Sequence, residues 1–156
     1  MGNMRFAVAF FALLGWTMTV SSQEGSLQGL AGKFALGEGL VVQQLGFDSD
    51  CDKSVSDAIA SVAELVDESY GDVVDAVLLW WREDDGDLVD ALVDALGPLA
   101  DSGVIWLMTP KPGRPGHVEP EDIADAAPTS GLQSTSNISA ATDWQGTRLV
   151  APKSRR

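Results

Sequence analysis

The chain has 156 residues, 45% of them hydrophobic, and a formal net charge of −13 at pH 7. That length and apolar content suffice for one compact domain and are too small for two domains of ordinary size. The negative charge argues against nucleic acid and anionic membrane surfaces as partners, because both require a basic surface that releases counterions.

The charge is unevenly distributed. Residues 1–109 hold 18 Asp or Glu against 4 Lys or Arg, whereas residues 110–156 hold 5 against 6. Any site for a small anionic ligand should therefore be sought after residue 109. The single cysteine, Cys51, excludes an intrachain disulfide, and its neighbours Asp50 and Asp52 disfavour the thiolate.

Residues 1–20 form an apolar N-terminal extension. Its stretch at residues 6–20 has the length of a signal-peptide core and is shorter than the roughly 20 residues of a spanning helix. Met18 lies within it, so a chain that starts there would lack the stretch. Three interpretations stay open: a misassigned start or non-functional extension, a signal, and a short anchor. The first predicts a cytoplasmic protein without a stable membrane span, and the second an exported or membrane-associated one.

The remaining chain divides into three parts. Residues 21–39 are rich in glycine and serine and are predicted to form a linker with at most a short helical piece near residues 27–34. Residues 40–153 are predicted to form a single α/β domain, and residues 154–156 a basic tail.

The domain is predicted to open with a strand at residues 40–47, where Gln43 and Gln44 lower the expected burial. A helix is predicted at residues 54–67, because Val55, Ile59 and Val62 recur at helical spacing. Ser54 is placed to cap this helix.

Residues 72–111 form the clearest unit of the sequence. Apolar runs at residues 73–81 and 103–109 predict two buried strands, and Asp87 is placed to cap a helix between them. A crossover of this length returns the chain in the same direction, so the strands should pair in parallel. Successive strand residues face opposite ways, so Trp80 and Trp81 cannot both line one pocket.

The last part is predicted to form a loop, a helix and a hairpin. The loop at residues 111–117 contains two Pro-Gly pairs, and Pro120 begins a helix that continues to about Ala127. Strands are predicted at residues 134–140 and 147–151, joined by a turn near residues 142–146.

Several segments together resemble the actinobacterial domain-of-unknown-function family 3052. They are DAVLLWWR, DLVDALVDAL, GVIWLMTPK, GRPGH and the ending DWQGTRLVAPK. The resemblance covers residues 36–153 and implies a small Rossmann-like protein of unknown activity. Family members begin near the equivalent of the linker, which favours the first interpretation of residues 1–20.

The order of elements also resembles a shortened class I methyltransferase core. The resemblance implies a small three-layer, Rossmann-like α/β fold with a mostly parallel sheet and a C-terminal antiparallel hairpin. Such enzymes carry a Gly-rich loop after the first strand, where backbone approaches the cofactor. Here Gly46 stands alone, followed by Phe47 and Asp48, so methyl transfer is not expected and no cofactor is predicted.

Ligands of open α/β sheets bind beyond the carboxyl ends of the strands. The candidate ligand-binding residues at that edge are Lys111, Arg114 and His117 on the loop, with Trp81 and Arg82 after a strand. The competing interpretation is a solvated connecting loop. No catalytic residue is predicted. No metal ligand is predicted either, because the acidic residues among 83–87 are explained by the start of a helix, where negative charge is favoured.

Two function classes follow. The first is a non-catalytic interaction or small-ligand-binding module that engages an unknown protein partner or a small anionic ligand. The second is an enzyme acting on a nucleotide-like or phosphorylated small molecule, including a degenerate methyltransferase-like protein. The sequence favours the first, because it offers no set of nucleophile, base and orienting group.

Overall fold

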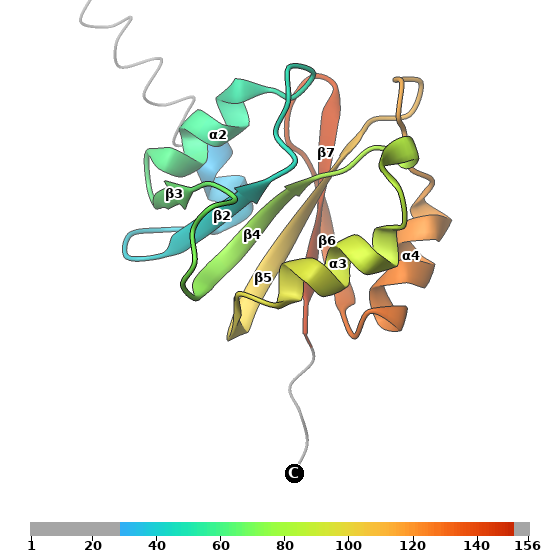
Figure 1. Cartoon of the computed structure of the whole chain (residues 1–156). Coiled ribbons are helices and arrows are strands. Elements are labelled where there is room, and N and C mark those ends of the chain that lie inside the picture. The colour runs from blue at the N-terminus through green and yellow to red at the C-terminus, as the bar shows by residue number, and fades with distance from the viewer. Residues whose placement is uncertain (1–28, 152–156) are drawn as a thin grey trace, which may run out of the picture.

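The computed structural model describes residues 29–151, in which one sheet lies between two helical layers (Figure 1). The apolar extension at residues 1–20, residues 21–28 of the predicted linker, and the basic tail lie outside the described residues. Between residues 29 and 151, no helix is long and apolar enough to cross a membrane.

The sheet has six strands in the order β3-β2-β4-β5-β7-β6. β2 pairs in parallel with β3 and β4, and β4 pairs in parallel with β5. β7 is antiparallel to both β5 and β6. This arrangement confirms the predicted mostly parallel sheet with a C-terminal antiparallel hairpin. The strands are β2 Val41–Leu45, β3 Glu64–Val66, β4 Val74–Trp80, β5 Leu99–Pro110, β6 Gln133–Ser139 and β7 Trp144–Val150.

Helices cover both faces of the sheet (Figure 1). One face packs against α3 (Leu88–Leu96) and α4 (Pro120–Thr129), with Trp81 among the buried residues on that side. The other face packs against α2 (Lys53–Ala60) and holds Trp80. The predicted opposite orientation of the two tryptophans is confirmed, and each is buried in a different apolar cluster.

The strand–helix–strand unit follows its predicted order. Asp87 caps α3, and its Oδ1 accepts hydrogen bonds from the backbone N–H of Val89 at 2.9 Å and of Asp90 at 3.4 Å. β5 begins at Leu99, earlier than expected, because Pro98 O accepts a hydrogen bond from Val74 N and starts the pairing. At the other end, β7 begins at Trp144, inside the predicted turn.

The predicted helix at residues 54–67 is wrong in its second half. α2 ends at Ala60, and Glu64–Val66 forms β3, which pairs with β2 through Val41↔Glu64. The apolar spacing of Val62 and Val66 fits a helix as well as a strand, so periodicity alone could not separate them. The cap also differs, because Asp52 rather than Ser54 accepts the capping hydrogen bond.

The predicted linker contributes to the core. Residues 29–34 are helical, and Phe34 is 1% exposed. The centroids of the Phe34 and Trp106 rings lie 5.0 Å apart in an edge-on arrangement. The Phe34 carbonyl oxygen accepts a hydrogen bond from Trp106 Nε1–H at 3.1 Å. The packed unit therefore includes residues before the predicted boundary at residue 40, because an aromatic side chain amid the glycines fills the sheet surface.

The two edges of the sheet differ. β3 at one edge has three residues. β6 at the other edge has seven, nearly all polar and exposed, and its pairing with β7 is interrupted between Ser134 and Ser136.

Candidate functional site

The carboxyl ends of three neighbouring parallel strands meet at one edge of the sheet, as the sequence predicts. Leu45 of β2 lies beside Leu79 of β4, and Trp80 lies beside Met108 of β5. The chain leaves β2 toward β3 on one side and returns as β4 on the other, so the strand order reverses between β2 and β4. In folds of this type, the crevice at such a reversal is the usual ligand site.

Gly46 lies at this reversal, where its backbone closely approaches the end of β4. Its φ is +78°, and a Cβ at this position would lie 2.5 Å from the carbonyl oxygen of Trp80. A side chain is therefore excluded on both backbone and steric grounds. The Gly46 N–H donates to Glu68 Oε2 at 3.1 Å, which ties the end of β2 to the segment after β3.

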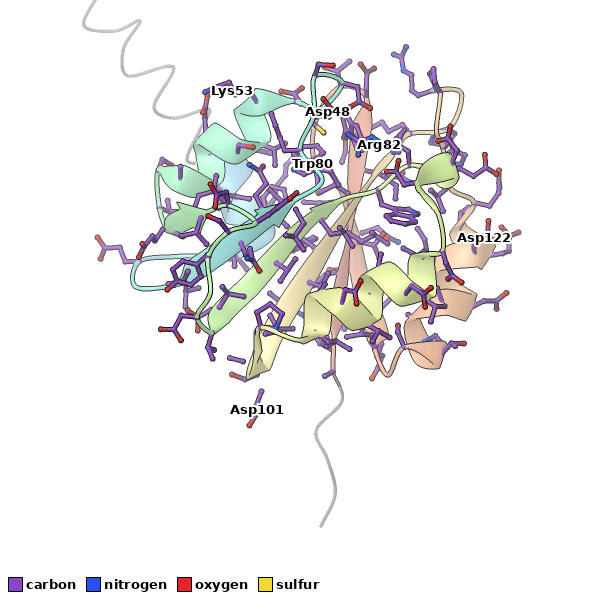
Figure 2. The ribbon with its side chains drawn as sticks, in the orientation of Figure 1. Asp48, Lys53, Trp80, Arg82, Asp101 and Asp122 are labelled. Carbon is purple, nitrogen blue, oxygen red and sulfur yellow. The ribbon has the colours of Figure 1, made fainter. Side chains whose placement is uncertain are left out.

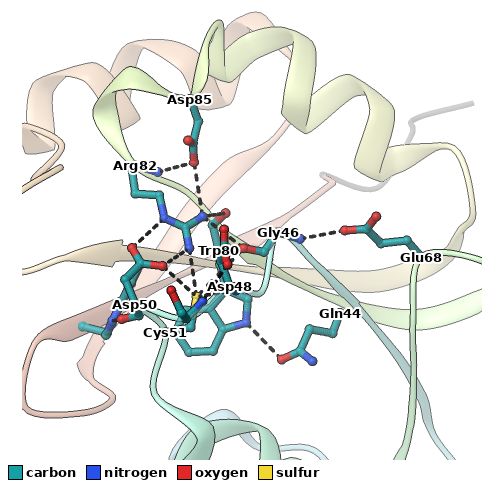
Figure 3. A network of polar contacts seen from close by, with 11 residues as sticks. Gln44, Gly46, Asp48, Asp50, Cys51, Glu68, Trp80, Arg82 and Asp85 are labelled. Atoms are coloured by element: carbon teal, nitrogen blue, oxygen red, sulfur yellow. Dashed lines mark hydrogen bonds and ion pairs between the residues drawn. The ribbon is translucent and has the colours of Figure 1, made fainter.

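Arg82 occupies the crevice between these strand ends (Figure 3). Its guanidinium holds the Asp50 carboxylate with two parallel hydrogen bonds, from Nε to Oδ2 at 2.9 Å and from Nη2 to Oδ1 at 2.6 Å. This bidentate geometry is the strongest form of an arginine–carboxylate contact.

The remaining donors of Arg82 are also used. Nη1 donates to Gly46 O at 3.0 Å and lies 3.3 Å from both Trp80 O and Asp85 Oδ2, while Nη2 lies 3.0 Å from Cys51 Sγ. The guanidinium carbon also lies 5.4 Å from the centroid of the Trp144 ring. Arg82 is 14% exposed and has no N–H left for a ligand while these contacts hold.

This network shifts three pKa values. The hydrogen bond from Arg82 lowers the pKa of Asp50, and the same contact raises the pKa of Arg82. Burial raises the pKa of the Cys51 thiol to about 11, against the lowering effect of the nearby guanidinium. The flanking aspartates predict a disfavoured thiolate, and the direction of the shift agrees, but burial is its largest cause.

Aromatic rings and a glutamine surround the network. The Trp80 and Trp144 rings meet edge-on at 4.9 Å, and Trp144 Nε1 donates to the carbonyl of Asp50 at 3.1 Å. Gln44 Oε1 accepts from Trp80 Nε1 at 3.0 Å, and the Gln43 amide donates to Asp67 O and Tyr70 O. Both glutamines are thus hydrogen-bonded inside the sheet, although their polarity suggested weaker burial.

The three loop residues predicted to bind an anion lie beside this crevice with partners of their own. Lys111 Nζ donates to Ser139 Oγ at 2.6 Å, and Arg114 Nε lies 2.9 Å from Asp143 Oδ1. His117 Nδ1–H donates to the Pro110 carbonyl at 2.8 Å, and its Nε2 lies 3.8 Å from Glu119 Oε2.

A pocket of about 200 Å³ opens beside Arg114, between Asp50, Pro110 and Trp144. Trp81 lies on the other face of the sheet and lines a different pocket, of about 380 Å³. The five predicted residues therefore lie at one edge of the sheet but in three separate places: Arg82 in its network with Asp50, Trp81 in the pocket on the other face, and the remaining three on the loop at residues 111–117.

Two residues of this edge escaped the sequence analysis. Asp50 belongs to the acidic loop after the first strand. Arg82 is the only arginine that follows a neighbouring predicted strand directly, and this position could have indicated its pairing with Asp50. Glu68 follows Gly46 by 22 residues. Among residues 29–151, no three His, Cys, Asp or Glu side chains converge closely enough to hold a metal ion.

The fold is shared with class I methyltransferases. The chain aligns with an O-methyltransferase from neocarzinostatin biosynthesis, NcsB1, solved in complex with S-adenosylmethionine, at a TM-score of 0.53 and 14% identity. That alignment covers 86% of this chain and 58% of the enzyme. A putative type 11 methyltransferase from Sulfolobus solfataricus aligns at a TM-score of 0.51 and 13% identity, covering 85% of this chain and 94% of that one. At such identities the likeness shows the fold alone.

The chain belongs to the family described as Protein of unknown function (DUF3052), whose sequence profile matches residues 31–153. Uncharacterised proteins of Mycobacterium tuberculosis and Mycobacterium bovis are 52% identical to it over 127 residues. Each alignment covers 80% of this chain and 80% of the relative. This membership confirms the resemblance inferred from the sequence segments.

Proposed function

We propose that this protein is a non-catalytic binding module that engages a small anionic ligand or a protein partner. The Arg82 network is the observation that supports this proposal. A methyltransferase or dinucleotide enzyme needs the crevice between the reversing strands for its cofactor. Here the Arg82 guanidinium, bonded to Asp50 and to the carbonyls of Gly46 and Trp80, lies between those strand ends.

The loop at residues 111–117 supplies the proposed anion site. Arg114 and Asp143 are each about half exposed, and an exposed ion pair contributes little stability, so an anion can replace Asp143 at low cost. Lys111 Nζ donates a hydrogen bond to the neutral Ser139 hydroxyl, so this contact does not neutralise the lysine charge that a ligand would meet. The loop backbone is ordered by the hydrogen bonds from Arg114 N to Lys111 O and from His117 N to Arg114 O.

One observation favours the second candidate, an enzyme acting on a nucleotide-like or phosphorylated molecule. Glu68 follows Gly46 by 22 residues and accepts from its N–H. In dinucleotide-binding folds, an acidic residue at about this spacing holds the ribose hydroxyls. A pocket of about 350 Å³ lies there, lined by Gln44, Phe47, Asp67, Glu68 and Ser69.

A ligand-dependent thermal unfolding experiment tests the proposal. Inorganic phosphate is expected to raise the unfolding temperature of the wild type, and Arg114→Ala is expected to abolish that rise. Arg148→Ala is the matched control, because Arg148 is hydrogen-bonded to Thr135 on the hairpin and lies outside the loop. A phosphate response that survives Arg114→Ala would contradict the loop site.

The same assay separates the two candidates. S-adenosylmethionine and adenosine are expected to leave the unfolding temperature unchanged, because the Arg82 guanidinium lies between the strand ends. A rise with either compound that disappears in Glu68→Gln would favour the nucleotide-directed enzyme.

A further inference from the structure

Trp81 differs from the other tryptophans of the described chain. The indole N–H groups of Trp80, Trp106 and Trp144 donate to protein oxygens at 3.0–3.1 Å. Within residues 29–151, the Trp81 indole N–H makes no hydrogen bond, although this residue is only 9% exposed. Buried indole N–H groups usually find a partner, so the Trp81 donor is left for water or a ligand.

This indole lines the pocket of about 380 Å³ on the α3–α4 side of the sheet. The pocket lies between the short helix η1 (Glu83–Asp85), the first turn of α3 and the segment that leads into α4. Its other lining residues are Glu83, Gly86, Asp87, Leu88, Val118 and Asp122. It therefore combines an aromatic ring, two aliphatic side chains and three carboxylates.

The pocket carries negative charge that no ion pair within residues 29–151 offsets. None of its lining residues is Lys or Arg, and in the described part of the chain Glu83, Asp87 and Asp122 take part in no ion pair. Asp87 directs one oxygen to the amides of α3, whereas Glu83 and Asp122 have no side-chain hydrogen bond within residues 29–151. A cationic group is thus favoured there by both the local carboxylates and the net charge of −13.

The size and chemistry of the pocket favour an organic cation over a metal ion. No three carboxylates of the described residues converge closely enough to share one ion. Leu88 and Val118 offer apolar contact that a hydrated metal cannot use. An aromatic ring beside carboxylates is a typical setting for an ammonium group.

We propose that this pocket binds a small alkylammonium that carries an oxygen acceptor next to its charge. The ammonium group lies between Glu83 and Asp122, and the oxygen accepts from Trp81 Nε1–H. The alkyl part contacts Leu88 and Val118. This inference is independent of the proposed anion site, because it concerns the opposite ligand charge and the opposite face of the sheet.

Choline and its neutral isostere, 3,3-dimethylbutan-1-ol, test the charge requirement. Nitrogen-15 NMR reports on each indole N–H separately, and Trp81→Phe assigns the Trp81 resonance. Choline is expected to shift this resonance in a saturable way at constant ionic strength, and the isostere is expected to bind at least roughly tenfold more weakly. Equal shifts with both compounds, or no saturable shift with choline, ethanolamine or Nα-acetyl-lysine amide, would overturn the proposal.

Two sets of variants test the residues. Glu83→Gln combined with Asp122→Asn is expected to weaken choline binding roughly tenfold, since each exposed charge contributes up to about fivefold. Asp101→Asn is the matched control, because Asp101 is an exposed acid far from the pocket (Figure 2). With backbone amide shifts as the readout, Trp81→Phe is expected to weaken choline more than tetramethylammonium, which has no oxygen to accept from the indole N–H. Equal loss in Asp101→Asn would show a general charge effect and contradict the site.

The source of the cation follows from the same titrations. Tighter binding of choline or ethanolamine than of Nα-acetyl-lysine amide would indicate a free small amine. The reverse order would contradict the proposal, because a lysine side chain carries no oxygen next to its ammonium group.

Discussion

Arg82 and Trp81 are neighbours in sequence and have opposite roles at the same edge of the sheet. Every N–H of the Arg82 side chain is directed at an acceptor in the chain, whereas the single N–H of the Trp81 side chain has none within residues 29–151. Both side chains are largely buried. One side of this edge is therefore closed by its own hydrogen bonds, whereas on the other side an indole N–H has no protein acceptor among residues 29–151.

The difference follows from strand geometry. Successive side chains at the end of β4 point to opposite faces of the sheet. Arg82 therefore lies on the side of α2 and of the turn that follows β2, where it contacts two carbonyls and Asp50. Trp81 enters the layer of α3 and α4, whose first turns present acids and aliphatic groups. The position of Trp81 and Arg82 in the sequence therefore predicts the sheet edge at which they lie. The helical layer that each side chain enters determines whether its N–H groups find acceptors.

Gly46→Ala is expected to damage the closed side most. The new Cβ would meet Trp80 O in a left-handed backbone conformation, and the two effects together cost about 3–4 kcal/mol of unfolding free energy. Gly113→Ala is the control, because Gly113 has a similar φ of +85° with nothing within 4 Å, and should lose only about 1 kcal/mol. Urea denaturation measures both, and equal losses would show that the contact with Trp80 is unimportant.

Arg82→Met is expected to cost about 2–3 kcal/mol, because it leaves the carbonyls of Gly46 and Trp80 and the Asp50 carboxylate without their donor. This loss of unfolding free energy is smaller than for a fully buried ion pair, since Asp50 is about half exposed. Arg82→Lys keeps the charge without the fork and is expected to recover only part of the loss. A neutral effect of Arg82→Met in urea denaturation would mean that the network contributes no net stability.

The same pair gives a pH dependence. The pKa of Asp50 is lowered in the folded protein, so its contribution is complete well above 3.8, the ordinary value, and is lost as pH falls through the folded pKa. The stability gap between wild type and Arg82→Met should therefore be widest near pH 7 and narrow below pH 3.8. Urea midpoints at several pH values measure it, and a gap that widens in acid would contradict the sign.

Cys51 offers a chemical probe of the closed side. Its pKa of about 11 leaves little thiolate at pH 8, so alkylation by iodoacetamide should be roughly a hundredfold slower than for a free cysteine. Unfolding in urea should restore the ordinary rate. A thiol that reacts as fast in the folded protein as in urea would show that the crevice is open.

Trp80→Phe and Trp81→Phe compare the two sides directly, and the expected difference in unfolding free energy between them is the smallest. Trp80→Phe removes a hydrogen bond to Gln44 as well as volume and is expected to cost about 2–3 kcal/mol. Trp81→Phe removes volume but no protein hydrogen bond and is expected to cost about 1 kcal/mol. Equal losses in thermal unfolding would indicate that the Trp81 N–H also has a structural partner.

Much of this fold is predictable from sequence, because its strongest elements are local patterns. The apolar runs and the Asp87 cap determine β4, α3 and β5, and a crossover of this length fixes their parallel pairing. β3 was missed because three residues carry too little periodicity to separate from the preceding helix. Phe34 was missed because its burial depends on Trp106, far along the chain.

The candidate site was predictable only as a location. Strand alternation and parallel pairing place Trp81, Arg82 and Lys111 at one edge without a structure. The pairing of Arg82 with Asp50 joins residues that are 32 positions apart and depends on the turn at Gly46, for which no local pattern exists. The missing acceptor of Trp81 is likewise a property of the surrounding layer, and no spacing in the sequence encodes it.

The unequal edges of the sheet have a consequence for self-association. An exposed strand edge is a template on which other chains can polymerise. β3 offers only three residues for such pairing, and β6 presents serine, threonine and asparagine with an interrupted register. Both ends of the sheet are thus poor surfaces for adding a further strand, which protects a protein with so apolar an interior from growing into fibres.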